Sequence, residues 1–197
     1  MSAVQNDRRL EVAEAAWRVI VREGLDRTSL RAIAHEMNCT TGVVTHYFRN
    51  KQELILFALH QVTARLQARM EAAMVGGAGD GAGIDRFVAM LSSFLPVDQE
   101  GQDILRVWAA FLGYAVGRED LMTNHRHSAE QLRQAILKEL ETLQQQHSIR
   151  MDLDLESEAN ILLALVNGLS LDSLIQSRQL SLEQQTAVIR RYIENLA

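Results

Sequence analysis

"TSLRAIAHEMNCTTGVVTHYFRNKQEL", residues 28–54, decides the fold of the N-terminal part of the chain. Apolar residues at helical spacing lie on both sides of the polar run "MNCT", which predicts two short helices joined by a turn. Thr28 is the expected N-cap of the first helix and Thr40 that of the second, which should end near Phe48. Such a pair forms a helix-turn-helix, whose second helix can enter a DNA major groove.

The residue types of the second helix suit contact with a duplex. Thr41, Thr45 and His46 can reach base edges or nearby phosphates. Val43 is small and apolar, as contact with a thymine methyl requires, and Gly42 removes a side chain where the helix must approach DNA. The sequence therefore predicts that this helix reads double-stranded DNA.

Phosphate contacts are expected at the ends of the helices. Lys51 falls in the first turn of the next helix, where the helix dipole disfavours a cation, and a phosphate opposite would explain it. The expected phosphate contacts are Thr28, Thr40, Tyr47 and Lys51, while Val44 and Phe48 should face the core. A packed corner of a helical bundle would explain the same pattern without DNA.

The rest of the chain also has helical periodicity and predicts an all-α fold of about nine helices. A first helix over residues 7–23, with Leu10 on its apolar stripe and Gly24 as C-cap, precedes the helix-turn-helix. A long helix follows over residues 51–74, and the glycine run 74–83 separates it from the remaining helices. We predict a DNA-binding domain over residues 1–52 and an effector-binding and dimerisation domain over 53–197.

Composition and charge are those of a soluble globular protein. The 197 residues are 47% hydrophobic and 23% charged, and we find no signal peptide and no uninterrupted apolar run near the roughly 18 residues of a membrane span. The lone Cys39 excludes an intrachain disulfide and fits a cytoplasmic protein. Residues 1–69 hold 10 Lys and Arg against 7 Asp and Glu, whereas residues 70–197 hold 10 against 18. Only the N-terminal third is therefore expected to meet a polyanion.

The C-terminal part should provide a dimer interface and a ligand site. Residues 158–175 are apolar over more than one face, and residues 181–196 add a second amphipathic helix, so the two can pair with their symmetry mates. Core packing within one chain is the alternative. Aromatic and Met side chains suit a largely apolar small-molecule effector, and the candidates are Phe94, Trp108, Phe111, Met122 and Asn167.

Metal binding and catalysis are not expected. His125 and His127 lie two positions apart and would point away from each other on a helix, so they and Glu130 are not predicted to hold a metal. The sequence has no P-loop, GxSxG, GxGxxG or HExxH motif and implies no cofactor. We therefore do not expect an enzyme.

Residues 8–60 resemble the DNA-binding core of TetR-family transcriptional regulators. The resemblance lies in Thr28, Ile33-Ala34, Thr41-Gly42, Tyr47-Phe48, Lys51 and Glu53-Leu54. Asn38 replaces the usual turn glycine, and Thr45 replaces a frequent tyrosine. The runs "TGVVTHYFRNK", "RVWAAFLGYA" and "LLALVNGLSLDSLI" are similar to the branch that contains the choline-responsive repressor of betaine synthesis.

The resemblance implies a cytoplasmic, homodimeric DNA-binding regulator, most often a repressor released from its operator by a small-molecule effector. A choline-like effector is implied only by the branch. A helical carrier or enzyme that retains a helix-turn-helix-like corner is the alternative, and the sequence leaves repressor and activator both open.

Overall fold

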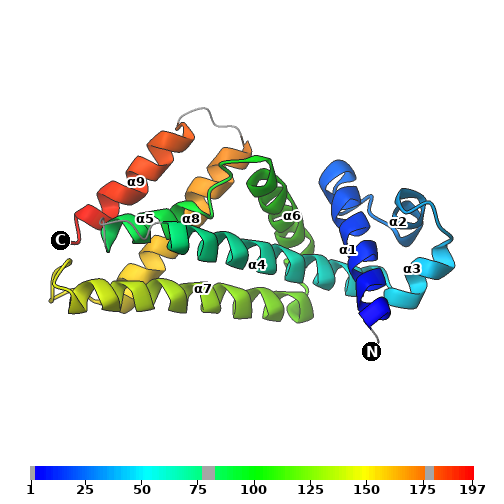
Figure 1. The fold of residues 1–197 in the computed structure, drawn as a ribbon, viewed down its shortest axis with the longest axis horizontal. Helices are drawn as coiled ribbons and strands as arrows, with labels where there is room; N and C mark the ends of the chain where they lie inside the picture. Colours follow the sequence, from blue (N-terminus) through cyan, green and yellow to red (C-terminus); the bar gives the residue numbers. More distant parts are fainter. Residues whose placement is uncertain (1–2, 77–82, 176–179) are drawn as a thin grey trace. The chain divides into compact units, whose positions relative to one another are not determined.

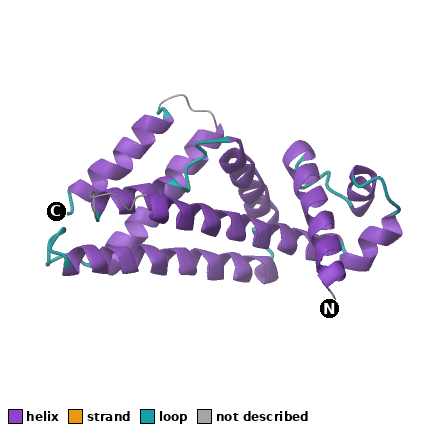
Figure 2. Cartoon of the chain, in the orientation of Figure 1, coloured by secondary structure: helices purple, strands orange, loops and turns teal. Residues whose placement is uncertain are grey.

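The computed structural model describes residues 3–76, 83–175 and 180–197, which form nine helices and no strand (Figures 1 and 2). This confirms the predicted all-α fold. The helices are α1 (Ala3–Glu23), α2 (Leu30–Glu36), α3 (Thr41–Tyr47), α4 (Lys51–Gly76), α5 (Ile84–Ser92), α6 (Gln99–Ala115), α7 (Glu119–Gln145), α8 (Leu155–Ile175) and α9 (Leu182–Glu194).

The chain packs into two compact units, and their boundary does not follow the order of the sequence. Unit 1 contains Met1–Ala64 and Arg106–Met122, and unit 2 contains Arg65–Leu105 and Thr123–Ala197. The second half of α6 therefore belongs to the same compact unit as the helix-turn-helix. The functional division predicted at residue 52 stays a prediction.

The core of unit 1 joins α1 to the helix-turn-helix. Val12, Ala15, Ala16 and Val19 of α1 are buried with Ile33, Ala34, Val44, Phe48 and Leu54. Burying each large apolar side chain stabilises the fold by about 1.5–3 kcal/mol. Leu10, which we expected on this stripe, is instead 46% exposed. It lies two residues before Val12, where the buried stretch of α1 begins.

Three backbone positions set the ends of the first helices. Gly24 ends α1 with φ +81° and donates its N–H to the Ile20 carbonyl at 2.9 Å, as the sequence predicts for a C-cap. Asn38 adopts φ +54° in the turn after α2, a left-handed conformation that asparagine tolerates. The asparagine in place of the usual glycine therefore leaves the turn intact.

The predicted cap of α2 is wrong by one residue. Ser29, not Thr28, is the N-cap, and its side chain accepts from the Ala32 N–H at 3.1 Å. Thr28 is 1% exposed, and its hydroxyl donates to the Gly24 carbonyl at 2.8 Å. The two adjacent hydroxyl residues thus make different hydrogen bonds. Thr28 stabilises the loop after α1, and Ser29 caps the N-terminus of α2.

Unit 2 has its own core, which α5, α7, α8 and α9 share. Phe87, Leu91, Leu140, Leu162 and Ile189 are fully buried there. Arg69 of α4 binds Asp98 at 2.9 Å, and Asp98 accepts from the Gly101 N–H at 2.7 Å in the first turn of α6. Helix α4 continues to Gly76, two residues into the predicted glycine break, and residues 77–82 of that run lie outside the described part.

Candidate nucleic-acid interface and a second exposed helix face

Helix α3 has one buried side and one open side. Val44 and Phe48 are fully buried, as predicted, and they anchor the helix in the core of unit 1. On the other side, Thr41, Gly42, Thr45 and His46 are exposed. We call these four residues, with the half-buried Val43 and Tyr47, the α3 face. All six were predicted as DNA contacts, and the structure places them on the short helix α3, where four are exposed and two are half-buried.

The backbone of the α3 face is accessible at Gly42. A Cβ built on Gly42 would meet only the Thr40 hydroxyl oxygen, at 3.7 Å, which is an ordinary contact. The fold therefore does not require glycine here, although glycine in a helix costs about 0.5–1 kcal/mol relative to alanine. This cost without a local packing reason favours an external surface that approaches the backbone at this point.

Hydrogen bonds at the start of α3 fix its polar groups. Thr40 is the N-cap, as predicted, with extended φ −80° and ψ 152°, and its side chain makes no capping hydrogen bond to the described helix. The Thr45 hydroxyl donates to the Gly42 carbonyl at 3.1 Å, which leaves its oxygen able to accept from an external donor. The His46 and Tyr47 rings meet edge to face with centroids 5.0 Å apart.

The α4 start explains the "NKQE" run that follows the recognition helix. Asn50 accepts the Glu53 N–H at 2.8 Å through its side-chain oxygen, and Glu53 accepts the Arg49 N–H at 3.0 Å. These two bonds satisfy backbone donors at a helix N-terminus. Lys51 donates from Nζ to the Asp26 carbonyl at 3.0 Å. The cation at the helix start thus has a partner within the chain, and a phosphate is not needed to explain it.

The predicted phosphate contact of Thr28 has no support in the structure. Its hydroxyl is buried and donates to a carbonyl of unit 1, so it does not face solvent. Thr40, Tyr47 and Lys51 keep polar atoms near the α3 face or the start of α4 and remain candidates.

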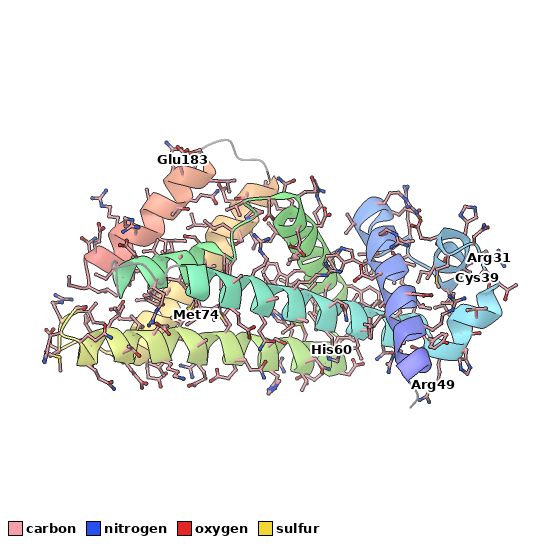
Figure 3. The ribbon with its side chains drawn as sticks, viewed as in Figure 1. Arg31, Cys39, Arg49, His60, Met74 and Glu183 are labelled. Atoms are coloured by element: carbon pink, nitrogen blue, oxygen red, sulfur yellow. The ribbon has the colours of Figure 1, made fainter. Side chains whose placement is uncertain are left out.

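Sequence reasoning did not include three exposed arginines near the helix-turn-helix. Arg27 and Arg31 flank the start of α2, and the Arg49 side chain is 89% exposed with Glu53 at 3.9 Å (Figure 3). Long exposed cations suit phosphate contacts. The signal was available in the excess of basic residues over residues 1–69, but it did not identify which of them face solvent.

A pair of arginines on α1 fixes the position of α2. Arg18 and Arg22 both donate to the Glu36 carboxylate at 2.8 Å. The hydrogen bonds from Arg18 and then Arg22 lower the pKa of Glu36 below its ordinary value of 4.5. Because α2 supports α3 through the core, this contact helps to hold the recognition helix in place.

The predicted effector residues divide between the two units. Trp108, Phe111 and Met122 belong to unit 1, and Phe94 and Asn167 belong to unit 2. Phe111 is 2% exposed, and the other four are half-buried. Phe94 packs against the unit 2 core. A half-buried side chain can serve the core or a ligand, and a buried one such as Phe111 can line an enclosed site, so all five stay proposed contacts.

Helix α8 presents a second exposed face, and it is apolar. Ile161 is 45% exposed and Ile175 is 76% exposed, with the exposed Ala164 and Gly168 between them at helical spacing. A Cβ built on Gly168 would meet no atom within 4 Å among the described residues. We call these four residues the α8 face. The α8 face thus combines two exposed isoleucines with two small residues.

The composition of α8 reflects this exposed face. Among the described residues, α8 is the one helix that is long and apolar enough to cross a membrane. Only 28% of its most apolar window is buried within the described structure. Polar residues such as Asn167 and Ser170 interrupt its apolar runs, so the sequence shows apolar residues on more than one face of this helix but no long uninterrupted apolar run. A helix with exposed apolar residues on one face can also bind another protein surface.

The surroundings of the α7 histidines can be described from the structure. Within the described residues, no group of three His, Cys, Asp or Glu side chains could hold a metal ion. Burial lowers the pKa of His125 below 6.5, and His127 lies 3.1 Å from the Gln131 amide. Glu130 pairs with Arg133 at 2.7 Å.

Comparisons with known proteins identify the family of the chain. Residues 12–57 match the model of bacterial regulatory proteins of the tetR family, and residues 83–197 match the C-terminal domain of BetI-type transcriptional repressors. The chain is 28% identical over 190 residues to the HTH-type transcriptional regulator PksA of Bacillus subtilis, across 96% of this chain and 89% of that protein. It is 24% identical over 187 residues to BetI of Vibrio campbellii, across 95% and 90% of the two chains.

Solved structures share the fold over nearly the whole chain. A transcriptional regulator from Rhodococcus sp. Rha1 superposes with a TM-score of 0.80 at 26% identity, covering 95% of each chain. A putative transcriptional regulator from Saccharomonospora viridis, solved in complex with choline, superposes with a TM-score of 0.84 at 22% identity, covering 96% of each chain. The full-length relatives are transcription regulators, which sets aside the alternative of a carrier or an enzyme. The chain belongs to the TetR family of DNA-binding transcriptional regulators and carries a BetI-type C-terminal domain.

Proposed function

We propose that this regulator is a cytoplasmic homodimeric repressor that a small-molecule effector releases from its operator. The observation that carries the proposal is the α3 face, where a backbone open at Gly42 lies among exposed hydroxyl and imidazole groups. Residues 1–52 would bind DNA, and residues 53–197 would bind the effector and form the dimer. Thr41, Val43 and His46 are the proposed base contacts, with Thr45 beside them.

The phosphate contacts are revised from those expected of the sequence. Thr40, Tyr47 and Lys51 remain, Thr28 is replaced, and the exposed Arg31 and Arg49 are added. Each phosphate contact releases counterions, so operator affinity should fall steeply as salt rises.

The α8 face supports the proposed dimer. Its exposed isoleucines would be buried against the same face of a second chain, and Ala164 and Gly168 would let the two helices approach closely. A two-fold dimer would present two α3 helices about 34 Å apart, or a multiple of that spacing. Both half-sites of an operator could then be bound at once.

The effector is proposed to be a small, largely apolar molecule that contacts Phe94, Trp108, Phe111, Met122 and Asn167. The neighbour from Saccharomonospora viridis binds choline, and aromatic rings such as Trp108 and Phe111 can hold a quaternary ammonium by cation–π attraction. Effector binding would favour a conformation that does not fit the operator, and by linkage DNA would weaken effector binding by the same factor.

Selection of bound fragments from the source genome tests the proposal. The full-length protein should retain specific fragments, and the selected duplex should lose affinity steeply between low and high salt. Substituting Thr41 and His46 by alanine should abolish the preference for the selected sequence. Arg150→Gln, which removes an exposed cation of unit 2, is the matched control and should leave binding unchanged.

Two results would overturn the proposal. The first is failure to enrich any fragment with the wild-type protein. The second is sequence-specific binding that survives the double substitution on α3. Loss of the complex on addition of choline would support the choline-like effector, and a complex insensitive to choline would reject that effector without affecting DNA binding.

A further inference from the structure

The corner between α6 and α7 contacts the first turn of α4 inside unit 1. The Gln52 side-chain amide donates to the Asp120 carboxylate, and the Lys51 ammonium lies 5.9 Å from the centroid of the Tyr114 ring. Residues more than sixty positions apart in sequence therefore meet at the start of α4. None of these contacts is needed to form the helix-turn-helix itself, whose core is made by α1 to α4.

The α6–α7 corner has a defined geometry. Gly117 adopts φ +82°, which favours glycine, and the Arg118 N–H donates to the Ala115 carbonyl at 2.8 Å. Leu121 is fully buried at the start of α7. The corner is thus anchored on both sides of Arg118, and the Tyr114 ring is presented by a fixed helix end.

Lys51 has contacts on two sides and still has donors to spare. Its ammonium carries three N–H donors, and the Asp26 carbonyl accepts one at 3.0 Å. The Tyr114 ring attracts the cation without using a hydrogen bond, because the attraction comes from the ring quadrupole. At least one donor therefore remains for an external acceptor such as a phosphate oxygen.

A second cation lies at the same ring. The Arg118 guanidinium lies 4.1 Å from the Tyr114 centroid, and Arg118 also donates to the Tyr114 carbonyl. The Asp120 carboxylate, which accepts from Gln52, lies at the same corner and offsets part of this positive charge.

We infer that Tyr114 is a positioning residue for DNA binding, since its ring holds the Lys51 ammonium where an operator phosphate can bind it. The inference rests on the proposed DNA-binding function. Tyr114 shares α6 with Trp108 and Phe111, two of the proposed effector contacts. A shift of this part of α6 on effector binding would move the Tyr114 ring and weaken the phosphate contact of Lys51.

Lysine-selective NMR tests the position of the ammonium directly. The chain contains only two lysines, Lys51 and Lys138, so protein labelled with carbon-13 lysine gives two ε-methylene signals. The ring current should displace the Lys51 signal, whereas Lys138, exposed on α7, is the internal reference. Tyr114→Leu should remove the displacement, and Tyr114→Phe should keep it. Operator DNA should shift the Lys51 signal and not the Lys138 signal.

Operator binding by full-length variants provides the second measurement. Tyr114→Leu should weaken binding about fivefold, the size expected from loss of one exposed cation–π contact, and Tyr114→Phe should stay within about twofold of wild type. In a Lys51→Met background, Tyr114→Leu should have no further effect. The slope of affinity against salt should fall by about 1 for each Lys51 phosphate contact that is lost.

The outcomes separate this inference from the proposed function. Three results would overturn the inference about Tyr114 without affecting the proposed DNA binding. They are an undisplaced Lys51 signal, tighter operator binding by Tyr114→Leu, and a loss of affinity from Tyr114→Leu that is equal with and without Lys51. If Tyr114→Leu does not fold, the inference is still tested by the Lys51 signal and operator binding of Tyr114→Phe, and by the response of the wild-type Lys51 signal to DNA. Failure of the wild-type protein to bind any DNA would reject the proposed function itself.

Discussion

The α3 face and the α8 face are both open surfaces of helices, and they differ in nearly every chemical respect. The α3 face carries hydroxyl and imidazole groups around Gly42, whereas the α8 face carries Ile161 and Ile175 around Gly168. Each has a helical glycine at which a built Cβ would meet no backbone atom within 4 Å among the described residues. Such a glycine permits close approach of another molecule, and the surrounding side chains indicate what kind of molecule suits each face.

The difference follows from what each partner can offer. DNA presents charged phosphates and a hydrated groove, so its contact surface is polar and wet. A second protein helix offers apolar side chains, and burying them excludes water. DNA binding by the α3 face should therefore weaken as salt rises, and an alanine substitution there should leave the fold intact. Dimer formation through the α8 face should depend on apolar contact and should be lost when a charged side chain is introduced.

The largest effect is expected from a charge on the α8 face. Ala164→Lys places an ammonium at the centre of the proposed dimer contact, where two copies would meet without a partner for either charge. The protein should become monomeric, and operator affinity should fall by about 100-fold or more because the two half-sites are no longer bound together. Analytical ultracentrifugation and a binding titration measure the two results.

Ala68→Lys is the matched control for that substitution. Ala68 is also an exposed helical alanine, but it belongs to α4 and is not part of the α8 face. It should leave the assembly and the operator affinity as in wild type. A dimeric Ala164→Lys protein with full operator affinity would contradict the assignment of the α8 face.

A smaller effect is expected from a single methyl group on the α3 face. Gly42→Ala should stabilise the free protein by about 0.5 kcal/mol, because a Cβ meets only an ordinary contact there and alanine favours the helix. Operator binding should nevertheless weaken by about 1–3 kcal/mol, comparable to one mismatched base pair. The midpoint of thermal unfolding should thus rise, while the operator affinity measured by fluorescence anisotropy should fall.

Gly113→Ala separates the folding effect from the binding effect. Gly113 is an exposed helical glycine of α6 with no atom within 4 Å of a built Cβ among the described residues. The substitution should stabilise the protein by a similar amount and leave operator affinity unchanged. If Gly42→Ala bound the operator as tightly as wild type, the DNA would not approach the backbone of α3 at this point.

Local sequence patterns predicted what depends on neighbouring residues. The periodicity of residues 28–54 placed Val44 and Phe48 in the core, and the same spacing left Thr41, Gly42 and His46 outside. Gly24 and Asn38 were recognised as left-handed positions because few residues adopt that conformation. These features are set by helix geometry over one or two turns, which a sequence displays directly.

Features that depend on distant parts of the chain were not predicted. Lys51 looked like an unpaired cation because Asp26 and Tyr114 are far from it in sequence. Thr28 and Ser29 both suit an N-cap, and only the packing of the loop after α1 decides between them. The grouping of the end of α6 with the helix-turn-helix has no local signature at all.

The smallest predicted effect concerns a hydrogen bond that joins α9 to α8. The Tyr192 phenol donates to the Glu158 carboxylate at 2.6 Å. Burial and then this carboxylate raise the pKa of Tyr192 from 10.0 to about 12. Because the folded pKa is the higher one, the stabilisation is fully present below about pH 10 and is lost as the pH rises toward 12.

Phenolate absorbance during an alkaline titration should show one of the three tyrosines ionising near pH 12, and Tyr192→Phe should remove that step. The same substitution leaves Glu158 without its donor and should lower the free energy of unfolding by about 1 kcal/mol at neutral pH. Operator affinity should stay unchanged, because Tyr192 belongs to neither face. Ionisation of Tyr192 near pH 10 would mean that this bond does not hold α9 to α8. The position of α9 against α8 would then depend on contact with the second chain of the proposed dimer.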